Sequence, residues 1–427
     1  MFDSALRSPH PMRGHGRILT AALVGTTVEF YDFYVFATAT ALVFGPLFFP
    51  KASPAAQGIS AFMVFGLAFV ARPLGAIAFG HFGDRAGRKS TLVASLMLMG
   101  GSTLAIAFLP TYAVAGALAP ALLCALRFGQ GFGLGGEWGG AALLAVEYAP
   151  PGWRARFGAA PQLGAPIGFL AANGLFLVLG LTLSAGQFVA WGWRVPFLVS
   201  AVLVGLGLWV RLRIAETPAF REALAKEDPH AVPLGPLLRD HWRALLAGSA
   251  GVVACFAIFY LATAFALAEG TTRLHYPRIA FLGVQLAANF FLAFGILAAA
   301  GWSDRRSPGR VLAWGAALTI FVGLVFGPGL GLGSLWTVFM TLADALFVMG
   351  LVYGPLGSWL PTLFPVRLRY TGISMAFNLG GILGGAVTPI LAKLLADGGH
   401  GGWVGGLLTL AGLLTLAGVA LAKPVTD

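Results

Sequence analysis

The sequence predicts an all-α polytopic membrane protein, with twelve transmembrane helices arranged in two pseudo-symmetric halves of six. Three observations predict this fold. The 427-residue chain is 58% hydrophobic and only 10% charged, with a mean hydropathy of +0.84, whereas a soluble domain carries about 25% charged residues. Its apolar residues gather in twelve runs, most of them close to the roughly 20 residues that cross a bilayer. Motifs of the first six runs also return in the last six.

The runs are predicted to be helices rather than strands, because apolar and polar residues do not alternate and the runs are too long. The first run is also too long for a cleavable signal peptide and lacks its layout. The weakest division precedes the sixth run, where Ser184-Ala-Gly-Gln187 is a short loop signal. In chain order, the runs cover residues 18–49, 57–82, 90–109, 113–147, 157–181, 189–211, 243–268, 279–301, 311–327, 334–361, 371–396 and 402–422.

The fourth run combines charges with glycines. Arg127 and Glu137 each cost about 2.5–3.5 kcal/mol on membrane-insertion scales, so we expect a polar helix face on an internal pathway. The alternative is that the two residues pair only to hold the bundle together. Glycine permits close approach of neighbouring helices. Seven glycines occupy positions 129, 131, 133, 135, 136, 139 and 140.

The basic residues orient the chain. With the N-terminus inside, 20 Lys and Arg residues lie in cytoplasmic loops and 5 lie outside, while Arg72 and Arg127 fall within runs. Positive residues favour the cytoplasmic side. We therefore expect a multi-pass protein of the plasma (cell inner) membrane with both termini in the cytoplasm. This distribution accounts for the net charge of +11 without a nucleic-acid partner.

The two halves repeat each other. The segment 80–89 follows the second run, and the similar segment 301–310 follows the eighth. Repeats six spans apart keep one orientation, so the halves are parallel repeats about an axis along the membrane normal. This arrangement suits alternating access. The predicted organisation is a first half at 1–211, a cytoplasmic linker at 212–240 and a second half at 241–427.

Enzymatic and metal chemistry are not indicated. Cys124 and Cys255 lie in apolar runs with no metal-ligand spacing, and no nucleophile–base set appears in the runs. We expect a transporter, not an enzyme, that needs no cofactor and uses the proton as its coupling ion. We expect it to be monomeric in the lipid bilayer.

Several motifs resemble those of the major facilitator superfamily. Gly80-x-x-x-Asp84-Arg85-x-Gly87-Arg88-Lys89 resembles its loop signature, and Arg127-x-x-Gln130-Gly131 its fourth-span signature. Val28-Glu29-Phe-Tyr31-Asp32-Phe-Tyr34 resembles the first span of the metabolite:proton symporter branch, which takes up organic acids and betaine-type osmolytes. Two departures from this branch leave the substrate open. Thr362 stands where the branch often has Glu, and the seventh span has phenylalanines around Tyr260 where the branch tends to have more tyrosines.

Proton coupling is predicted at the first span. Glu29 and Asp32 stand at positions i and i+3, on one helix face. Two adjacent carboxylates in a low dielectric cannot both ionise cheaply, so one is expected to take up a proton near neutral pH. The alternative is a permanent ion pair with an arginine of the bundle. Asp32 leads, and Glu137 is a third candidate. Asp344 in the tenth run is the other acid predicted to lie deep in a span, and a site role and a structural role are equally supported for it.

Substrate binding is predicted around the fourth span. The planar fork of Arg127 matches a carboxylate, and Gln130 lies one turn further on the same face. For Tyr31 and Tyr34, packing is as good an explanation as binding. For Arg72, beside Pro73, a hinge is an equally good explanation. Tyr260 completes the candidate set.

The loop signature predicts a conformational latch rather than a binding site. A basic turn between helix ends can pair with acids and helix termini of neighbouring spans and release them during rocking. The predicted latch residues are Asp84, Arg85, Gly87, Arg88, Glu147, Arg154 and Arg156, with Asp304, Arg305 and Arg310 in the repeat.

The function predicted from these features is proton-coupled symport of a small organic carboxylate of the dicarboxylate, tricarboxylate or keto-acid type, by alternating access. A zwitterionic osmolyte such as betaine or proline is the alternative substrate. A proton-driven exporter and a ligand-sensing receptor on a transporter fold are the remaining alternatives.

Overall fold

The computed structural model describes residues 15–86, 88–135, 137–213 and 234–425, with side chains except at 17, 18, 80–92, 144, 210–213 and 367. Within these ranges the ordered elements are all helical. Most of the predicted linker at 212–240 lies outside them, so the predicted domain boundaries stay predictions.

The first half contains helices α1 to α11. They are α1 (Gly16–Ala39), η1 (Thr40–Phe44), α2 (Gly45–Phe48), α3 (Pro54–Ala86), α4 (Arg88–Ala107), α5 (Tyr112–Ala115), α6 (Leu118–Leu134), α7 (Glu137–Glu147), α8 (Arg154–Gln162), α9 (Gly164–Thr182), α10 (Ala185–Ala190), η2 (Gly192–Arg194) and α11 (Val195–Arg213). The short loop signal of the sequence becomes a capping box, in which Ser184 and Gln187 bond reciprocally at the start of α10. Gly116 separates α5 from α6 with a φ of 55°, a conformation that favours glycine.

The second half contains helices α13 to α22. They are α13 (Leu234–Asp240), α14 (Trp242–Tyr260), η3 (Leu261–Phe265), α15 (Ala266–Thr272), α16 (Arg278–Arg305), α17 (Pro308–Gly331), α18 (Leu335–Tyr353), α19 (Leu356–Trp359), η4 (Leu360–Leu363), η5 (Val366–Leu368), α20 (Arg369–Gly381), η6 (Ile382–Val387), α21 (Thr388–Asp397), η7 (Gly401–Trp403) and α22 (Val404–Leu421). All twelve predicted runs therefore correspond to helices. Ten helical stretches of the described residues are long and apolar enough to span a membrane, and the third and fourth spans are α4 and α6 with α7.

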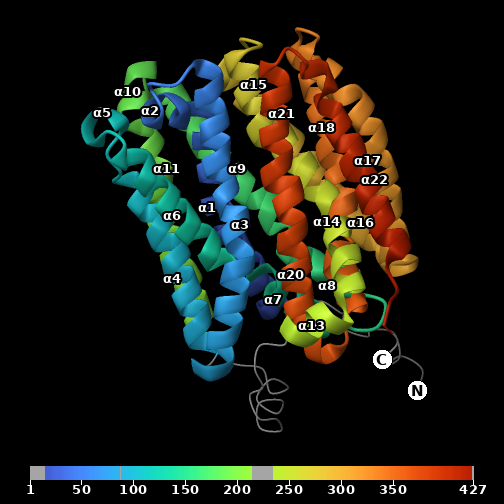
Figure 1. Cartoon of the computed structure of the whole chain (residues 1–427). Coiled ribbons are helices and arrows are strands. Elements are labelled where there is room, and N and C mark those ends of the chain that lie inside the picture. Colours follow the sequence, from blue (N-terminus) through green and yellow to red (C-terminus); the bar gives the residue numbers. More distant parts are fainter. Residues whose placement is uncertain (1–14, 87, 136, 214–233, 426–427) are drawn as a thin grey trace, which may run out of the picture.

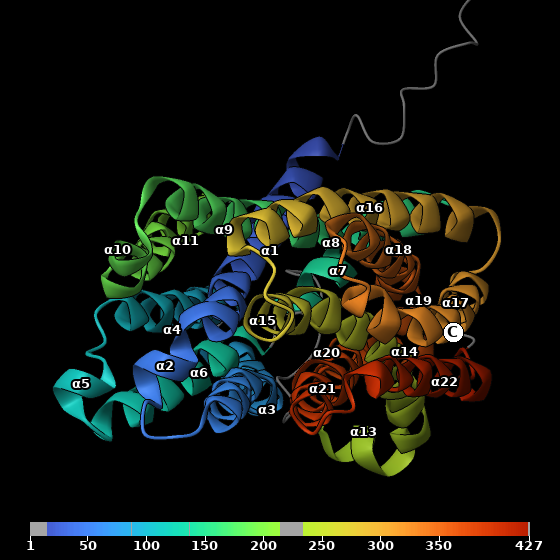
Figure 2. The same cartoon turned by 90° about the horizontal axis from the view of Figure 1, so that it is seen from above.

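The helices form an upright bundle of two side-by-side groups (Figures 1 and 2). The groups meet along two seams, one between α8 and α9 of the first half and α16 of the second, the other between α3 and α20, η6 and α21. We call the end where α22 finishes and α13 lies the terminal end, and the other the opposite end (Figure 1). A central space between the halves is thus enclosed by long helices from both.

Three spans contain a π-helical turn. These turns are η1 in the first span, η3 in the seventh and η6 in the eleventh. The sequence did not predict them. Such turns widen the hydrogen-bond ladder by one residue and are frequent at functional sites. Because η1 and η3 occupy corresponding spans and contact each other, they mark the place where the halves meet.

Close packing of α6 against α3 depends on glycine, as predicted. A Cβ at Gly131 would lie 2.3 Å from the carbonyl oxygen of Ala68, and one at Gly135 would lie 2.1 Å from that of Arg72. Both obstacles are backbone atoms, so neither can move aside without separating the helices. This contact fixes Arg72 and Arg127, which these two helices carry.

We predict that Gly131→Ala destabilises the fold, because its Cβ would meet the Ala68 backbone. Overpacking of this kind costs about 1–3 kcal/mol, so the midpoint of thermal unfolding in detergent should fall. The matched control is Gly101→Ala on α4, where nothing lies within 4 Å of the added carbon. Equal midpoints for the two variants would contradict the packing role.

Candidate functional site

Two buried arginines share one aromatic ring at the centre of the first half. The guanidinium carbon of Arg127 lies 4.1 Å from the centroid of Phe33, and that of Arg72 lies 4.4 Å from it. Arg127 is 0% exposed and Arg72 is 5% exposed. Cation–π contact is worth about 2 kcal/mol or more when desolvated, so Phe33 stabilises two charges that repel each other.

Arg127 is incompletely hydrogen-bonded. Its Nε donates to the Phe65 carbonyl at 3.2 Å and one Nη donates to Oε1 of Gln130, while the other Nη has no hydrogen-bond partner. Among the described side chains, no carboxylate forms an ion pair with it, so Glu137 does not. The structure therefore does not contain the ion pair between Arg127 and Glu137 that the alternative interpretation required.

Arg72 lies between the two halves. Its guanidinium also contacts the ring of Phe69, at 4.8 Å, and its Nε has no hydrogen-bond partner. Glu29 of the same half and Tyr260 of the other lie within electrostatic range of it. Arg72 is thus a binding candidate as well as a neighbour of the Pro73 kink.

The predicted proton-coupling residues are all buried. Asp32 is 0% exposed, accepts a hydrogen bond from Ser200 through Oδ1, and has no partner at Oδ2. Glu137 accepts from Ser95 and interacts electrostatically with Asp32. Glu29 is 6% exposed and has interactions of its own. Among the described side chains of the first half, five charged ones are therefore buried, which are Glu29, Asp32, Arg72, Arg127 and Glu137.

Gln130 joins the first and fourth spans. Its Nε2 donates to the main-chain carbonyl of Asp32 at 3.2 Å and to Oγ1 of Thr103 at 2.9 Å. Tyr31 is used within the first half, because its hydroxyl donates to the carbonyl of Pro196 at 2.9 Å. The structure thus makes Gln130 a positioning residue for Arg127, and it does not bring the Tyr31 hydroxyl to this group.

Aromatic rings line the space between the halves. The Tyr260 ring lies 5.9 Å from that of Phe33, and the Tyr34 ring lies 4.9 Å from that of Phe259. Beside Tyr34 is a cavity of about 10 Å³, the volume that holds a single water. Both predicted tyrosines therefore face the interface between the halves, where this cavity lies.

The terminal end is closed by contacts between the halves. Asp304, at the end of α16, accepts from the main-chain N–H of Ala155 at 2.7 Å and of Arg156 at 3.2 Å. It also lies 3.6 Å from Nε of Arg156. A carboxylate at a helix N-terminus satisfies free N–H groups and complements the helix dipole. Asp304 and Arg156, both predicted latch residues, thus form a cap between the halves.

A second closure lies nearer the centre. The Trp138 ring stacks on Phe377 at 3.6 Å, and its Nε1 donates to the hydroxyl of Tyr353 at 3.0 Å. Asn378 donates to the carbonyl of Gly135 at 2.7 Å. Each contact joins the two halves, so the path from the centre to the terminal end is blocked.

The remaining latch predictions divide into two groups. Glu147, Arg154, Arg305 and Arg310 are exposed at the terminal end, and Glu147 has interactions of its own. The side chains of Asp84, Arg85 and Arg88, and all of Gly87, lie outside the described residues. The latch role of the first loop accordingly stays a prediction.

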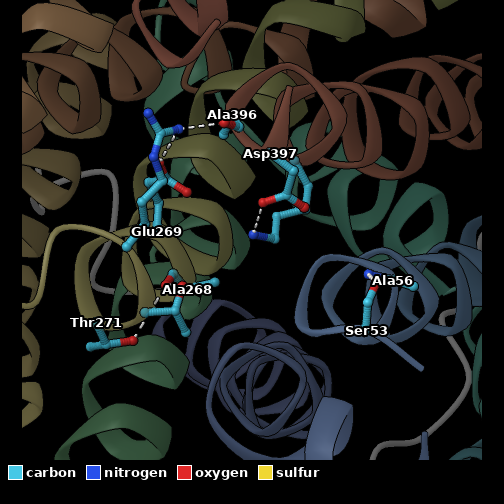
Figure 3. Close-up of polar contacts among 10 residues, drawn as sticks. Ser53, Ala56, Ala268, Glu269, Thr271, Ala396 and Asp397 are labelled. Carbon is cyan, nitrogen blue, oxygen red and sulfur yellow. Dashed lines mark hydrogen bonds and ion pairs between the residues drawn. The ribbon is translucent and has the colours of Figure 1, made fainter. Parts of the chain in front are cut away.

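The opposite end contains a charged cluster that the sequence analysis missed. Figure 3 shows Glu269 on α15 near Asp397 on α21. Glu269 is 5% exposed and pairs with Arg273 at 3.1 Å, while Asp397 pairs with Lys393. A Cβ at Gly58 of α3 would lie 2.7 Å from Cε of Lys393, so the lysine stem packs across the seam. The seventh predicted run ended at 268, one residue too early to include Glu269.

Asp344 is less buried than the sequence predicted. The sequence placed it deep in the tenth span, with site and structure equally supported, but its side chain is exposed on α18. The exposed side of a span cannot be told from its buried side by a single acid. Asp344 therefore does not belong to the central group.

Comparison with known proteins matches this architecture. The sequence profile of the sugar (and other) transporter family matches residues 18–231. The chain belongs to the major facilitator superfamily. The predicted family and its metabolite and betaine-type branch are thus confirmed, as is the prediction of a transporter rather than an enzyme.

Three known proteins are similar to this chain in sequence or in fold. The inner membrane metabolite transport protein YhjE of Escherichia coli K12 is 45% identical over 395 residues, covering 90% of this chain and 89% of its own. The shikimate transporter of the same organism is 36% identical, with 94% of each chain covered. The proton:xylose symporter XylE bound to 6-bromo-6-deoxy-D-glucose has the same fold, with a TM-score of 0.75, 17% identity, and 96% and 95% of the chains covered.

We predict that Asp304→Asn loosens the terminal end, because it loses the charge that caps α8 and pairs with Arg156. Loss of a cap costs about 0.5–2 kcal/mol. Amide hydrogen exchange in residues 154–162, measured by mass spectrometry, should become about 2- to 30-fold faster. The control is Asp240→Asn, whose exposed side chain pairs with its neighbour Arg239; equal exchange in both variants would refute the cap.

Proposed function

We propose that this protein is a proton-coupled symporter that imports a small organic carboxylate by alternating access. The observation that carries the proposal is the buried charge group of the first half. It contains the two guanidiniums of Arg72 and Arg127, each with an unpartnered nitrogen, and three carboxylates. Charges at hydrocarbon depth are expensive unless they are neutralised.

The charge group links protons to anions. Arg127 and Asp32 are both buried and are joined through Gln130. A substrate carboxylate that binds the arginines adds one negative charge at this depth, and a proton taken up by Asp32 offsets it. Each bound carboxylate therefore favours the uptake of one proton, and the reverse holds by linkage.

Asp32 is the residue that best fits this proton. Its Oδ2 is buried and has no hydrogen-bond partner in the described structure, so it can hold a proton there. Its main-chain carbonyl also accepts from Gln130, which in turn binds Arg127. The proton site and the anion site are therefore connected through one side chain.

The conformation supports transport by rocking. Contacts between the halves close the terminal end, and at the opposite end the Lys393 stem packs against Gly58 across the seam. Release of one end at a time exposes the centre to one side of the membrane, which is the motion expected of two parallel repeats. The loops at the terminal end contain an excess of Lys and Arg residues, which supports a cytoplasmic location for that end.

The relatives support a carboxylate. The shikimate transporter is named for a carboxylate cargo, and XylE is described as a proton:xylose symporter. A zwitterion such as betaine also offers a carboxylate to Arg127, so charge alone does not separate the two classes. Uptake into proteoliposomes of labelled carboxylates and betaines, with and without an inward proton gradient, tests the proposal. Gradient-driven uptake of betaines alone, or of neither class, would overturn it.

We predict that Arg127→Lys weakens carboxylate binding, because lysine keeps the charge but loses the planar fork. Removing a charged hydrogen bond costs about 1.5–3 kcal/mol, which corresponds to about 10- to 150-fold in the dissociation constant. The matched control is Arg194→Lys near the opposite end, where the arginine donates to the carbonyls of Ala190 and Leu109. At normal expression, an unchanged affinity in Arg127→Lys would exclude the anchor role.

We predict that Asp32→Asn abolishes accumulation driven by a proton gradient while substrate exchange persists. The amide fixes a neutral group of the same shape, so the anion binds without taking up a proton. Counterflow and gradient-driven uptake, measured in the same vesicles, separate the two activities. If Asp32→Asn and Glu29→Gln both accumulate substrate normally, the proton site lies elsewhere and Glu137 is next.

A further inference from the structure

The cavity between the halves has polar groups on opposite sides. Tyr34 and Thr38 of α1 and Asn173 of α9 come from the first half, while Thr263 of η3 and Gln285 of α16 come from the second. The Tyr34 and Phe169 rings form an apolar wall, 5.6 Å apart at their centroids. A water-sized space with converging polar groups from both halves is therefore present beside the charge group.

The orientation of Gln285 is fixed by the π-helical turn. Its Nε2 donates to the carbonyls of Ala262 at 3.0 Å and Thr263 at 2.8 Å. A flipped amide would place its oxygen against two carbonyl oxygens, so this orientation is the one the contacts require. Oε1 is then left without a hydrogen-bond partner, on a side chain that is 1% exposed and lines the cavity.

Asn173 supplies the complementary group. Its Oδ1 accepts from Thr38 at 2.8 Å, and its Nδ2 makes one long bond, 3.4 Å, to the carbonyl of Phe169. An amide nitrogen carries two donor hydrogens, so Nδ2 retains a donor. Gln285 therefore presents an unmet acceptor, and Asn173 presents a spare donor.

We propose that Gln285 and Asn173 form a hydroxyl-binding subsite, so that the substrate is a hydroxylated carboxylate. A hydroxyl donates one hydrogen bond and accepts others, which matches Gln285 Oε1 and Asn173 Nδ2. This inference rests on the proposed function, in which the arginines bind the carboxylate. The Tyr260 ring lies 5.9 Å from Phe33, which the arginines share, and the adjacent Phe259 ring lies 4.9 Å from Tyr34, which lines the cavity. A substrate that enters between these rings when the halves part therefore engages both places.

The subsite also defines what is rejected. A carboxylate without a hydroxyl leaves Gln285 Oε1 unsatisfied, and a site with buried polar groups discriminates against such analogues. A trimethylammonium group has no donor for Oε1. The subsite thus favours hydroxylated acids over both plain acids and betaines.

The test compares pairs of labelled carboxylates that differ by hydroxyl groups, in proteoliposomes with an inward proton gradient. Suitable pairs are lactate with propionate, malate with succinate, and shikimate with cyclohexene carboxylate. The wild-type protein should take up the hydroxylated member of at least one pair about tenfold more efficiently. Gln285→Met, of similar length, should lose that preference while it takes up the plain member as before.

Two further variants make the result specific. Asn289→Leu is the matched control, because Asn289 lies one turn along α16, donates to the carbonyl of Pro166 at 2.9 Å, and does not line the cavity; it should keep the preference. Asn173→Leu should lose it, and this variant decides the question if Gln285→Met does not fold.

The outcomes are distinguishable. Equal uptake of both members of every pair by the wild type, or an unchanged preference in Gln285→Met and Asn173→Leu, overturns the subsite and shows a structural water only. Either result leaves the proposed function standing. No uptake of any carboxylate, with or without a hydroxyl, overturns the proposed function itself.

Discussion

The cost of burying charge governs this structure. Of the side chains that the structure describes, five charged ones are buried in the first half, whereas in the second half these are Glu269 and Lys393, each near a partner of opposite sign. The two guanidiniums are held by the ring of Phe33 and by the glycine contact of α3 with α6. An unmatched charge in a low dielectric binds whatever restores neutrality. Protons and substrate anions are the mobile species that can do so.

Contacts that hold the two halves together are opposed by buried polar groups that would gain hydrogen bonds if the halves parted. At the seam of α8 and α9 with α16, Gln162 has two unpartnered amide atoms, and Asn289 and Gln285 each have one. An unsatisfied buried polar group costs about 1–3 kcal/mol, and water would satisfy these groups once the halves part. The Asp304 cap and the Trp138–Phe377 stack oppose that gain. Alternating access requires such a balance, because neither end can be closed irreversibly.

The sequence predicted the helices, the repeat and the charged residues of the centre, because length, hydropathy and spacing encode them directly. It could not predict the π-helical turns, since one extra residue in a turn leaves apolar periodicity unchanged. Glu269 was missed because the end of a run is poorly defined, and Asp344 was placed too deep because packing decides which side of a helix is buried. Gln285 was overlooked because a single amide in an apolar run does not indicate a role until its hydrogen-bond partners are known. A contact of Asp304 with the other half was predictable, since the repeated loop motif placed an acid there, and the structure has it at the start of α8.

The central claim is that a substrate anion and a proton enter the charge group together. Its most direct test measures protons taken up when a carboxylate substrate binds to the purified protein in weakly buffered detergent, using a pH indicator. The account predicts uptake of about one proton for each carboxylate bound near neutral pH, and none when a neutral carboxamide of the same shape is added. Saturable carboxylate binding with no change in proton content would contradict it.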